Sequence, residues 1–223
     1  MSVKEKPGTS RHAAGSKMGE MLTPPLFHVG SSLRNPGLND PSDTRYRSSA
    51  MTTLIAFSGS LRQDSFNTRV LRALPALAPA GTQIALFDIA ELPMYNQDLD
   101  GETVPEIVAA LRTAIAEADG VIIAGPEYSG SYSGATKNLI DWASRPFMAG
   151  PIIGKTSMVI ATTPGPGGGK NVLPATAGLL QALGGKVVAQ VGAAAIHEKL
   201  AADSDTIIDE EFAQQLREGL AAF

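Results

Sequence analysis

Short apolar runs alternate with longer amphipathic stretches from residue 52 to the end of the chain. The apolar runs predict strands, and the amphipathic stretches predict helices. The expected strands are 53–57, 83–87, 120–124, 157–162 and 186–190. The expected helices are 67–78, 105–118, 135–144, 171–183 and 205–222. Regular strand and helix alternation is typical of parallel sheets with helical crossovers, so the sequence predicts an α/β fold with a five-stranded parallel sheet.

Five strands with helices on both faces fit a flavodoxin-like three-layer sandwich with strand order 2-1-3-4-5. In that order, ligands bind beyond the carboxyl ends of the strands, where strands 1 and 3 lie side by side. The loops after these two strands, the first loop (58–65) and the second loop (125–134), are both polar and glycine-containing. This agrees with the flavodoxin-like order, although other doubly wound orders stay open because sequence order does not fix strand order.

Residues 1–50 differ in composition from the rest of the chain. They lack apolar periodicity, which predicts a disordered or loosely attached N-terminal extension. They carry seven basic and four acidic residues, a net charge of +3, whereas residues 51–223 carry eleven basic and eighteen acidic residues, a net charge of −7. A transit peptide is disfavoured by the acidic residues and prolines. We therefore expect one folded domain over 51–223, and deletion of residues 1–50 should leave folding and cofactor binding intact.

Composition excludes several classes of function. The chain has no cysteine, which excludes disulfides and thiolate metal sites and is compatible with a cytoplasmic location. The formal net charge of −4 disfavours nucleic-acid binding. No apolar run approaches the roughly 20 residues of a membrane helix, so no membrane partner is expected. No histidine-rich or cysteine pattern supports a metal site.

The junction between the first strand and the first helix carries the strongest functional signal. It reads Ser58-Gly-Ser-Leu-Arg-Gln-Asp-Ser-Phe-Asn67. Free backbone N–H groups and the positive end of the helix dipole favour an anion there, and the Arg62 guanidinium can bind two phosphate oxygens at once. The spacing matches neither the dinucleotide fingerprint nor the nucleotide P-loop. The alternative is a serine-rich turn with Ser65 as helix N-cap.

Two further loops lie at the same edge of the predicted sheet. Glycines 125, 130 and 134 of the second loop would let the backbone approach a flat heteroaromatic ring, with Tyr128 adding apolar surface. The alternative is a turn-rich connection with surface tyrosines. The third loop (162–170) ends in GGGK but lacks the P-loop spacing. It is either a wall of the same pocket or a hinge-rich loop without ligand contact.

Three motifs occur together in order: G-S-L-R-x-x-S-F-N at 59–67, P-E-Y-S-G-S at 126–131 and K-N-x-x-D-W at 137–142. With them, the chain resembles the NADPH-dependent FMN reductase family, which includes bacterial chromate and quinone reductases, over residues 52–222. The resemblance implies that residues 51–223 form a flavodoxin-like FMN-binding domain. It implies that the FMN phosphate is surrounded by Ser58, Ser60, Arg62, Ser65 and Asn67, and that Phe66, at the start of the helix, also belongs to the cofactor site. It also implies that the isoalloxazine ring is lined by Pro126, Glu127, Tyr128, Ser129 and Gly130.

The resemblance further implies an enzyme that takes hydride from NADPH or NADH onto FMN and reduces a quinone, chromate, an azo compound or free flavin. It implies a homodimer or homotetramer, with residues 92–98 near the subunit interface. No catalytic acid, base or nucleophile is predicted, because the flavin supplies the chemistry. Two rival functions stay open: a flavodoxin-type electron carrier without its own NAD(P)H turnover, and a nonredox scaffold that has lost flavin.

Overall fold

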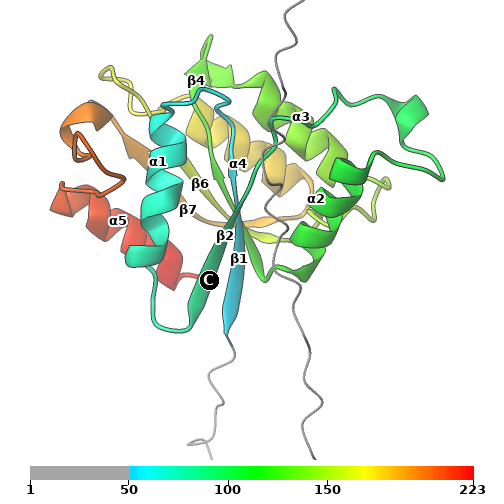
Figure 1. Cartoon of the computed structure of the whole chain (residues 1–223), viewed down its shortest axis with the longest axis horizontal. Helices are drawn as coiled ribbons and strands as arrows, with labels where there is room; N and C mark the ends of the chain where they lie inside the picture. Colours follow the sequence, from blue (N-terminus) through cyan, green and yellow to red (C-terminus); the bar gives the residue numbers. More distant parts are fainter. Residues whose placement is uncertain (1–50) are drawn as a thin grey trace, which may run out of the picture. The chain divides into compact units, whose positions relative to one another are not determined.

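The central sheet has five parallel strands in the order β2-β1-β3-β6-β7 (Figure 1). The computed structural model describes residues 51–223, so the expectation for residues 1–50 lies outside the described residues. The strands of the sheet are β1 Thr52–Ser58, β2 Thr82–Phe87, β3 Gly120–Ala124, β6 Thr156–Thr162 and β7 Lys186–Ala193. Two short strands, β4 Glu127–Tyr128 and β5 Ser131–Tyr132, form a separate hairpin. The predicted order 2-1-3-4-5 is therefore confirmed for the main sheet.

Helices cover both faces of the sheet and complete three layers (Figure 1). They are α1 Phe66–Ala73, α2 Glu106–Glu117, α3 Gly134–Ala143, α4 Val172–Ala182 and α5 Glu210–Ala221. One apolar core lies between the sheet and α1 with α5, and a second lies between the sheet and α2, α3 and α4. None of the helices in residues 51–223 has both the length and the apolar character that crossing a membrane requires.

Strand β3 shows why the apolar runs form this sheet. Every residue of Gly120–Ala124 is buried. Val121 and Ile123 point into the core under α2 and α3, while Ile122 and Ala124 point into the core under α1 and α5. Side chains alternate between the two faces of a strand, so a strand covered on both faces must be apolar throughout.

The C-terminal helix begins later than the sequence predicts. The expected start at residue 205 is wrong because Asp209 caps α5, its carboxylate accepting a hydrogen bond from the Phe212 amide at 2.8 Å. Asp205 instead pairs with Arg69 of α1 at 3.0 Å. A carboxylate near a helix start does not by itself identify the cap, because its partner can come from another element.

The β4–β5 hairpin occupies the second loop, where the sequence predicts only a connection. Its two turn residues, Ser129 and Gly130, have φ angles of 51° and 74°. Two successive positive φ values are typical of the tight type I′ turn that joins antiparallel strands. Tyr128 pairs with Ser131 across this hairpin, and its side chain is half exposed.

Strand register brings the ends of β1, β3 and β6 to one edge. Ser58 pairs with Ala124, and Ala124 pairs with Ile160. The first loop crosses close to the start of α3, since a Cβ built on Gly59 would lie 2.0 Å from the Thr136 hydroxyl. Any other residue at this position would have to displace the Thr136 side chain, so glycine allows the first loop to lie against the second.

Candidate functional site

The first loop is organised by its own hydroxyl groups. Ser65 is the N-cap of α1, and its side chain accepts from the Thr68 amide at 3.3 Å. The Ser58 hydroxyl contacts that of Thr68 at 2.7 Å and donates to the Ser60 carbonyl at 3.1 Å. Ser58 thus stabilises the conformation of the first loop through hydrogen bonds within it. Ser65 is the N-cap of α1, as the interpretation of this junction as a serine-rich turn predicts.

One cavity of about 280 Å³ joins the three loops. Its lining comprises Ser60, Arg62, Ser65, Phe66, Asn67, Pro126, Glu127, Tyr128, Thr162, Thr163 and Pro164. It therefore brings together most of the residues predicted to bind the phosphate and the ring. Ser58 instead lines a neighbouring cavity, and Ser129 and Gly130 form the turn of the hairpin.

Polar contacts fix the three loops to one another around this cavity. The Ser133 hydroxyl donates to the Gly59 carbonyl at 2.6 Å, which joins the second loop to the first. The buried Asn67 side chain accepts from the Thr162 amide at 3.1 Å, which joins the start of α1 to the end of β6. Buried, satisfied hydrogen bonds of this kind hold a unique geometry. These two contacts therefore hold the three loops together around the cavity.

Glu127 makes the third of these contacts. Its carboxylate accepts from the side-chain amide of Asn171 at 2.7 Å and from the backbone amides of Asn171 and Val172 at 3.0 and 3.2 Å. The side-chain bond from Asn171 is the main reason that the pKa of Glu127 lies below its ordinary value. The carboxylate is thus charged at neutral pH and faces the start of α4.

Thr162 opens the third loop, for which the sequence leaves two alternatives open, and it is not among the residues predicted to form the site. This residue is buried at the end of β6 and lines the cavity, and its Oγ1 has no hydrogen-bond partner within residues 51–223. A buried hydroxyl without a partner costs free energy, so such a group signals a missing acceptor or donor. The signal in the sequence was the place of the third loop after the fourth strand, at the same edge of the sheet as the other two loops. Thr163 and Pro164 also line the cavity, which makes the third loop one of its walls.

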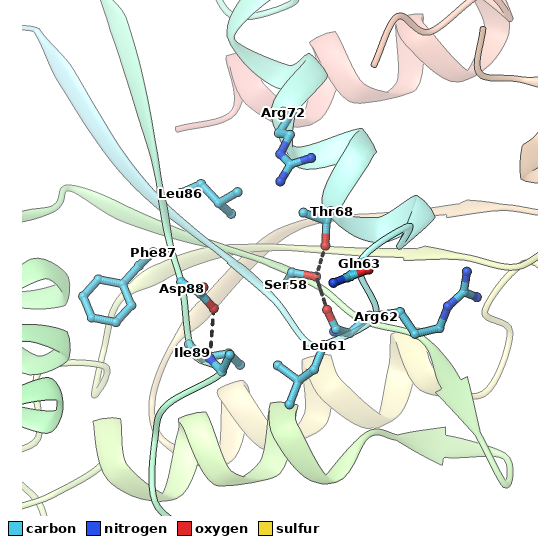
Figure 2. A pocket seen from close by; sticks show the side chains of 12 residues that line it. Ser58, Leu61, Arg62, Gln63, Thr68, Arg72, Leu86, Phe87, Asp88 and Ile89 are labelled. Atoms are coloured by element: carbon cyan, nitrogen blue, oxygen red, sulfur yellow. Dashed lines mark hydrogen bonds between the residues drawn. The ribbon is translucent and has the colours of Figure 1, made fainter. Parts of the chain in front are cut away.

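A second cavity, of about 370 Å³, lies between α1 and the end of β2 (Figure 2). Gln63 and Arg72 face it, beside the paired hydroxyls of Ser58 and Thr68 (Figure 2). Figure 2 shows Arg62 at the rim, with its guanidinium directed away from Leu86. The guanidinium donates to the Asp64 carbonyl at 3.1 Å, which uses one of its five N–H groups.

The K-N-x-x-D-W motif serves the fold. Asn138 accepts from the Tyr95 amide at 2.7 Å and donates to the Pro93 carbonyl at 3.0 Å. Trp142 is fully buried and donates to the same Pro93 carbonyl at 2.7 Å, while Asp141 pairs with Lys137 at 2.6 Å. Through Asn138 and Trp142, the motif therefore holds the segment after β2 against α3.

The lining of the three-loop cavity suits a mononucleotide. Hydroxyl and amide groups and a guanidinium gather at the start of α1, where the helix dipole favours an anion. Pro126 and Tyr128 supply a flatter, less polar surface at the other side. The Thr162 hydroxyl, without a partner in residues 51–223, adds a polar group between them. The chemistry of this lining, with anion-binding groups near α1 and a less polar surface at the hairpin, fits a group such as FMN.

Comparisons with known proteins agree with this geometry. The sequence model of the family described as NADPH-dependent FMN reductase matches residues 52–199. A 2-hydroxy-1,4-benzoquinone reductase from Burkholderia sp is 45% identical over 107 residues, which cover 48% of this chain and 58% of the relative. An NADPH:quinone oxidoreductase from Arabidopsis thaliana is 44% identical over 122 residues, covering 52% of this chain and 60% of the relative. The chain thus spans about 60% of the length of these curated relatives.

A solved structure covers more of the chain. It is FerB, a flavoenzyme NAD(P)H:(acceptor) oxidoreductase from Paracoccus denitrificans, with 35% sequence identity and a TM-score of 0.67. The alignment covers 77% of this chain and 94% of FerB. The similarity therefore extends over most of the described domain.

Proposed function

The chain belongs to the NADPH-dependent FMN reductase family, and from this premise we propose that it is an FMN-containing oxidoreductase. The electron donor is NADPH or NADH, and the acceptor is a small molecule, with quinones favoured over chromate, azo compounds or free flavin. The observation that carries the proposal is the single cavity that joins Arg62 and Ser65 to Tyr128. One mononucleotide can therefore reach both the phosphate-binding and the ring-binding groups.

In this proposal, the residues of the chain bind and orient the cofactor. Ser60, Ser65 and Arg62 hold the phosphate, and the dipole of α1 adds to the attraction. Pro126 and Tyr128 contact the ring. When bound, FMN supplies the chemistry of hydride acceptance and electron transfer. No side chain of the cavity is assigned as an acid, base or nucleophile.

A spectral experiment tests this function. We expect the purified protein to carry, or to bind on addition, a yellow flavin whose visible absorption is lost when NADPH or NADH is added without oxygen. The absorption should return when a quinone is supplied. Flavin that binds but is not bleached by either nicotinamide would favour the electron carrier. A protein that fails to bind FMN would favour the nonredox scaffold.

We predict opposite effects of Thr162→Val on the apoprotein and on cofactor binding. Removing a buried hydroxyl without a partner should leave the stability of the FMN-free protein unchanged or raised. If this hydroxyl bonds to FMN, its loss should weaken binding by about two- to tenfold, the scale of a neutral hydrogen bond. Thermal unfolding of the apoprotein and fluorescence titration with FMN measure the two quantities. Unchanged FMN affinity would remove Thr162 from the cofactor site.

We also propose that the protein forms a homodimer or homotetramer. Met94, Phe147 and Met148 expose 73%, 77% and 73% of their surface. The Arg145 guanidinium lies over the rings of both Tyr95 and Phe147, so these apolar side chains belong to one surface. Light scattering of the full chain tests the proposal, and a monomer at micromolar concentration would contradict it. That residues 1–50 can be deleted without loss of folding or cofactor binding, and that the protein is cytoplasmic, stay predictions.

A further inference from the structure

Glu127 connects two segments that are far apart in the sequence. It begins strand β4, and its three hydrogen-bond contacts reach the start of α4, 44 residues along the chain. Charge-assisted hydrogen bonds to a carboxylate are about twice as strong as neutral ones. The Glu127 side chain is thus a specific link between the hairpin and α4.

Helix α4 lacks a cap from its own sequence. Its N-cap residue, Asn171, makes no side-chain bond to the following turn. The amides of Asn171 and Val172, which a helix cannot satisfy internally, donate instead to the Glu127 carboxylate. A negative group at this end also complements the helix dipole. Glu127 of the hairpin therefore provides the N-terminal cap that α4 does not obtain from its own N-cap residue.

The second loop is held at both ends. Ser133 binds it to the first loop through the Gly59 carbonyl, and Glu127 binds it to α4. Between these two contacts stand Tyr128 and the tight turn of the hairpin. The position of Tyr128 on the wall of the cavity therefore depends on the contact between Glu127 and the start of α4.

We propose that Glu127 is a positioning residue for the cofactor: its carboxylate clamps the β4–β5 hairpin to the start of α4 and so sets the second loop and the third loop as one wall of the cavity. The inference rests on the proposed FMN site. It assigns to the Glu127 side chain a role through Asn171 and α4, whereas Tyr128 of the same strand is the residue proposed to contact the ring.

Three variants test the clamp. Glu127→Ala removes all three contacts, Glu127→Gln keeps the shape but loses the charge, and Asn171→Ala removes only the shortest contact. Glu210→Ala is the matched control, because Glu210 lies in the first turn of α5 and its carboxylate pairs with Arg217 at the exposed surface. Each protein is studied as the full chain, with and without FMN.

The first measurement is hydrogen exchange in the FMN-free protein. We expect the amides of Asn171 and Val172, together with those of the hairpin, to exchange at least tenfold faster in Glu127→Ala than in wild type. Glu127→Gln should give an intermediate rate, and Glu210→Ala should not change these amides. Unchanged exchange in Glu127→Ala would overturn the clamp, whatever the outcome for FMN.

The second measurement is FMN binding. We expect Kd to rise about tenfold in Glu127→Ala, with partial rescue in Glu127→Gln and a smaller rise in Asn171→Ala. At saturating FMN, the visible absorption band of Glu127→Ala should move toward that of free flavin, because the wall beside the ring is no longer fixed. A Kd within twofold of wild type together with an unshifted band would overturn the positioning role.

The two measurements separate this inference from the proposed function. If wild type itself fails to bind FMN, the reductase proposal fails, while hydrogen exchange still decides whether the clamp exists. If Glu127→Ala does not fold, Asn171→Ala replaces it in both experiments. Faster exchange with unchanged FMN binding would show that Glu127 stabilises the start of α4 but does not position the cofactor. That result would contradict the proposal.

Discussion

Replacing Trp142 with alanine is expected to lower the free energy of unfolding by about 3–5 kcal/mol, the usual range for removing a large buried aromatic side chain. The ring is fully buried, and it meets Tyr95 edge-on with a centroid distance of 4.9 Å. Its Nε1 also donates to the Pro93 carbonyl at 2.7 Å. The substitution would leave both a cavity and a carbonyl without its partner.

Urea unfolding followed by far-ultraviolet circular dichroism measures this loss, because Trp142 is the only tryptophan and its fluorescence disappears with it. Trp142→Phe keeps most of the packing and loses only the N–H group, so it should lose less stability than alanine. Ile208→Ala, at a side chain that is 61% exposed and lies outside the surface proposed for subunit contact, is the surface control and should change stability little. A loss below about 1 kcal/mol in Trp142→Ala would contradict the packing role of the motif.

Arg62→Ala is expected to weaken FMN binding by about 1.5–3 kcal/mol, or about 10- to 150-fold in Kd. The guanidinium lines the cavity at the start of α1 and is exposed, so its loss should leave the fold intact. The removed interaction is a charge-assisted hydrogen bond to the phosphate. Fluorescence titration of the apoprotein with FMN measures the effect. Riboflavin lacks the phosphate, so Arg62→Ala should leave its affinity almost unchanged.

Arg72→Ala is the matched control for this prediction. Arg72 lies ten residues further on, in α1, and lines the second cavity between α1 and β2 (Figure 2). It should change Kd less than twofold, whereas Arg62→Lys should retain part of the affinity. Equal losses from Arg62→Ala and Arg72→Ala would mean that positive charge near α1 attracts FMN without a defined phosphate site.

The fold was largely predictable because its signals are local. The uninterrupted apolar run 120–124 is what a strand buried on both faces requires, and the structure buries all of it. The polar loops after the first and third strands pointed to the correct neighbours in the sheet, since a ligand site requires them to be adjacent. The order β2-β1-β3 confirms that inference.

The remaining features depend on contacts between distant residues. Nothing near Glu127 shows that its carboxylate turns to α4, because its partners lie 44 residues away. Nothing near Asp205 shows that Arg69 holds it outside the last helix. The Asn67 side chain accepts from the backbone amide of Thr162, whereas the Thr162 hydroxyl has no hydrogen-bond partner within residues 51–223. Only the folded structure shows this difference. In each case the local sequence allows several hydrogen-bond partners, and the tertiary structure determines which one is used.

The position of β1 inside the sheet, between β2 and β3, has a consequence for biosynthesis. Its partner β2 is made soon after it, but the other side of β1 waits for β3, since Leu54 pairs with Gly120. Until then, a nascent chain carries an apolar strand with an open edge, which is the kind of surface that associates wrongly. Chains stalled on the ribosome with β3 outside the tunnel should resist protease far better than chains stalled with β3 still inside it.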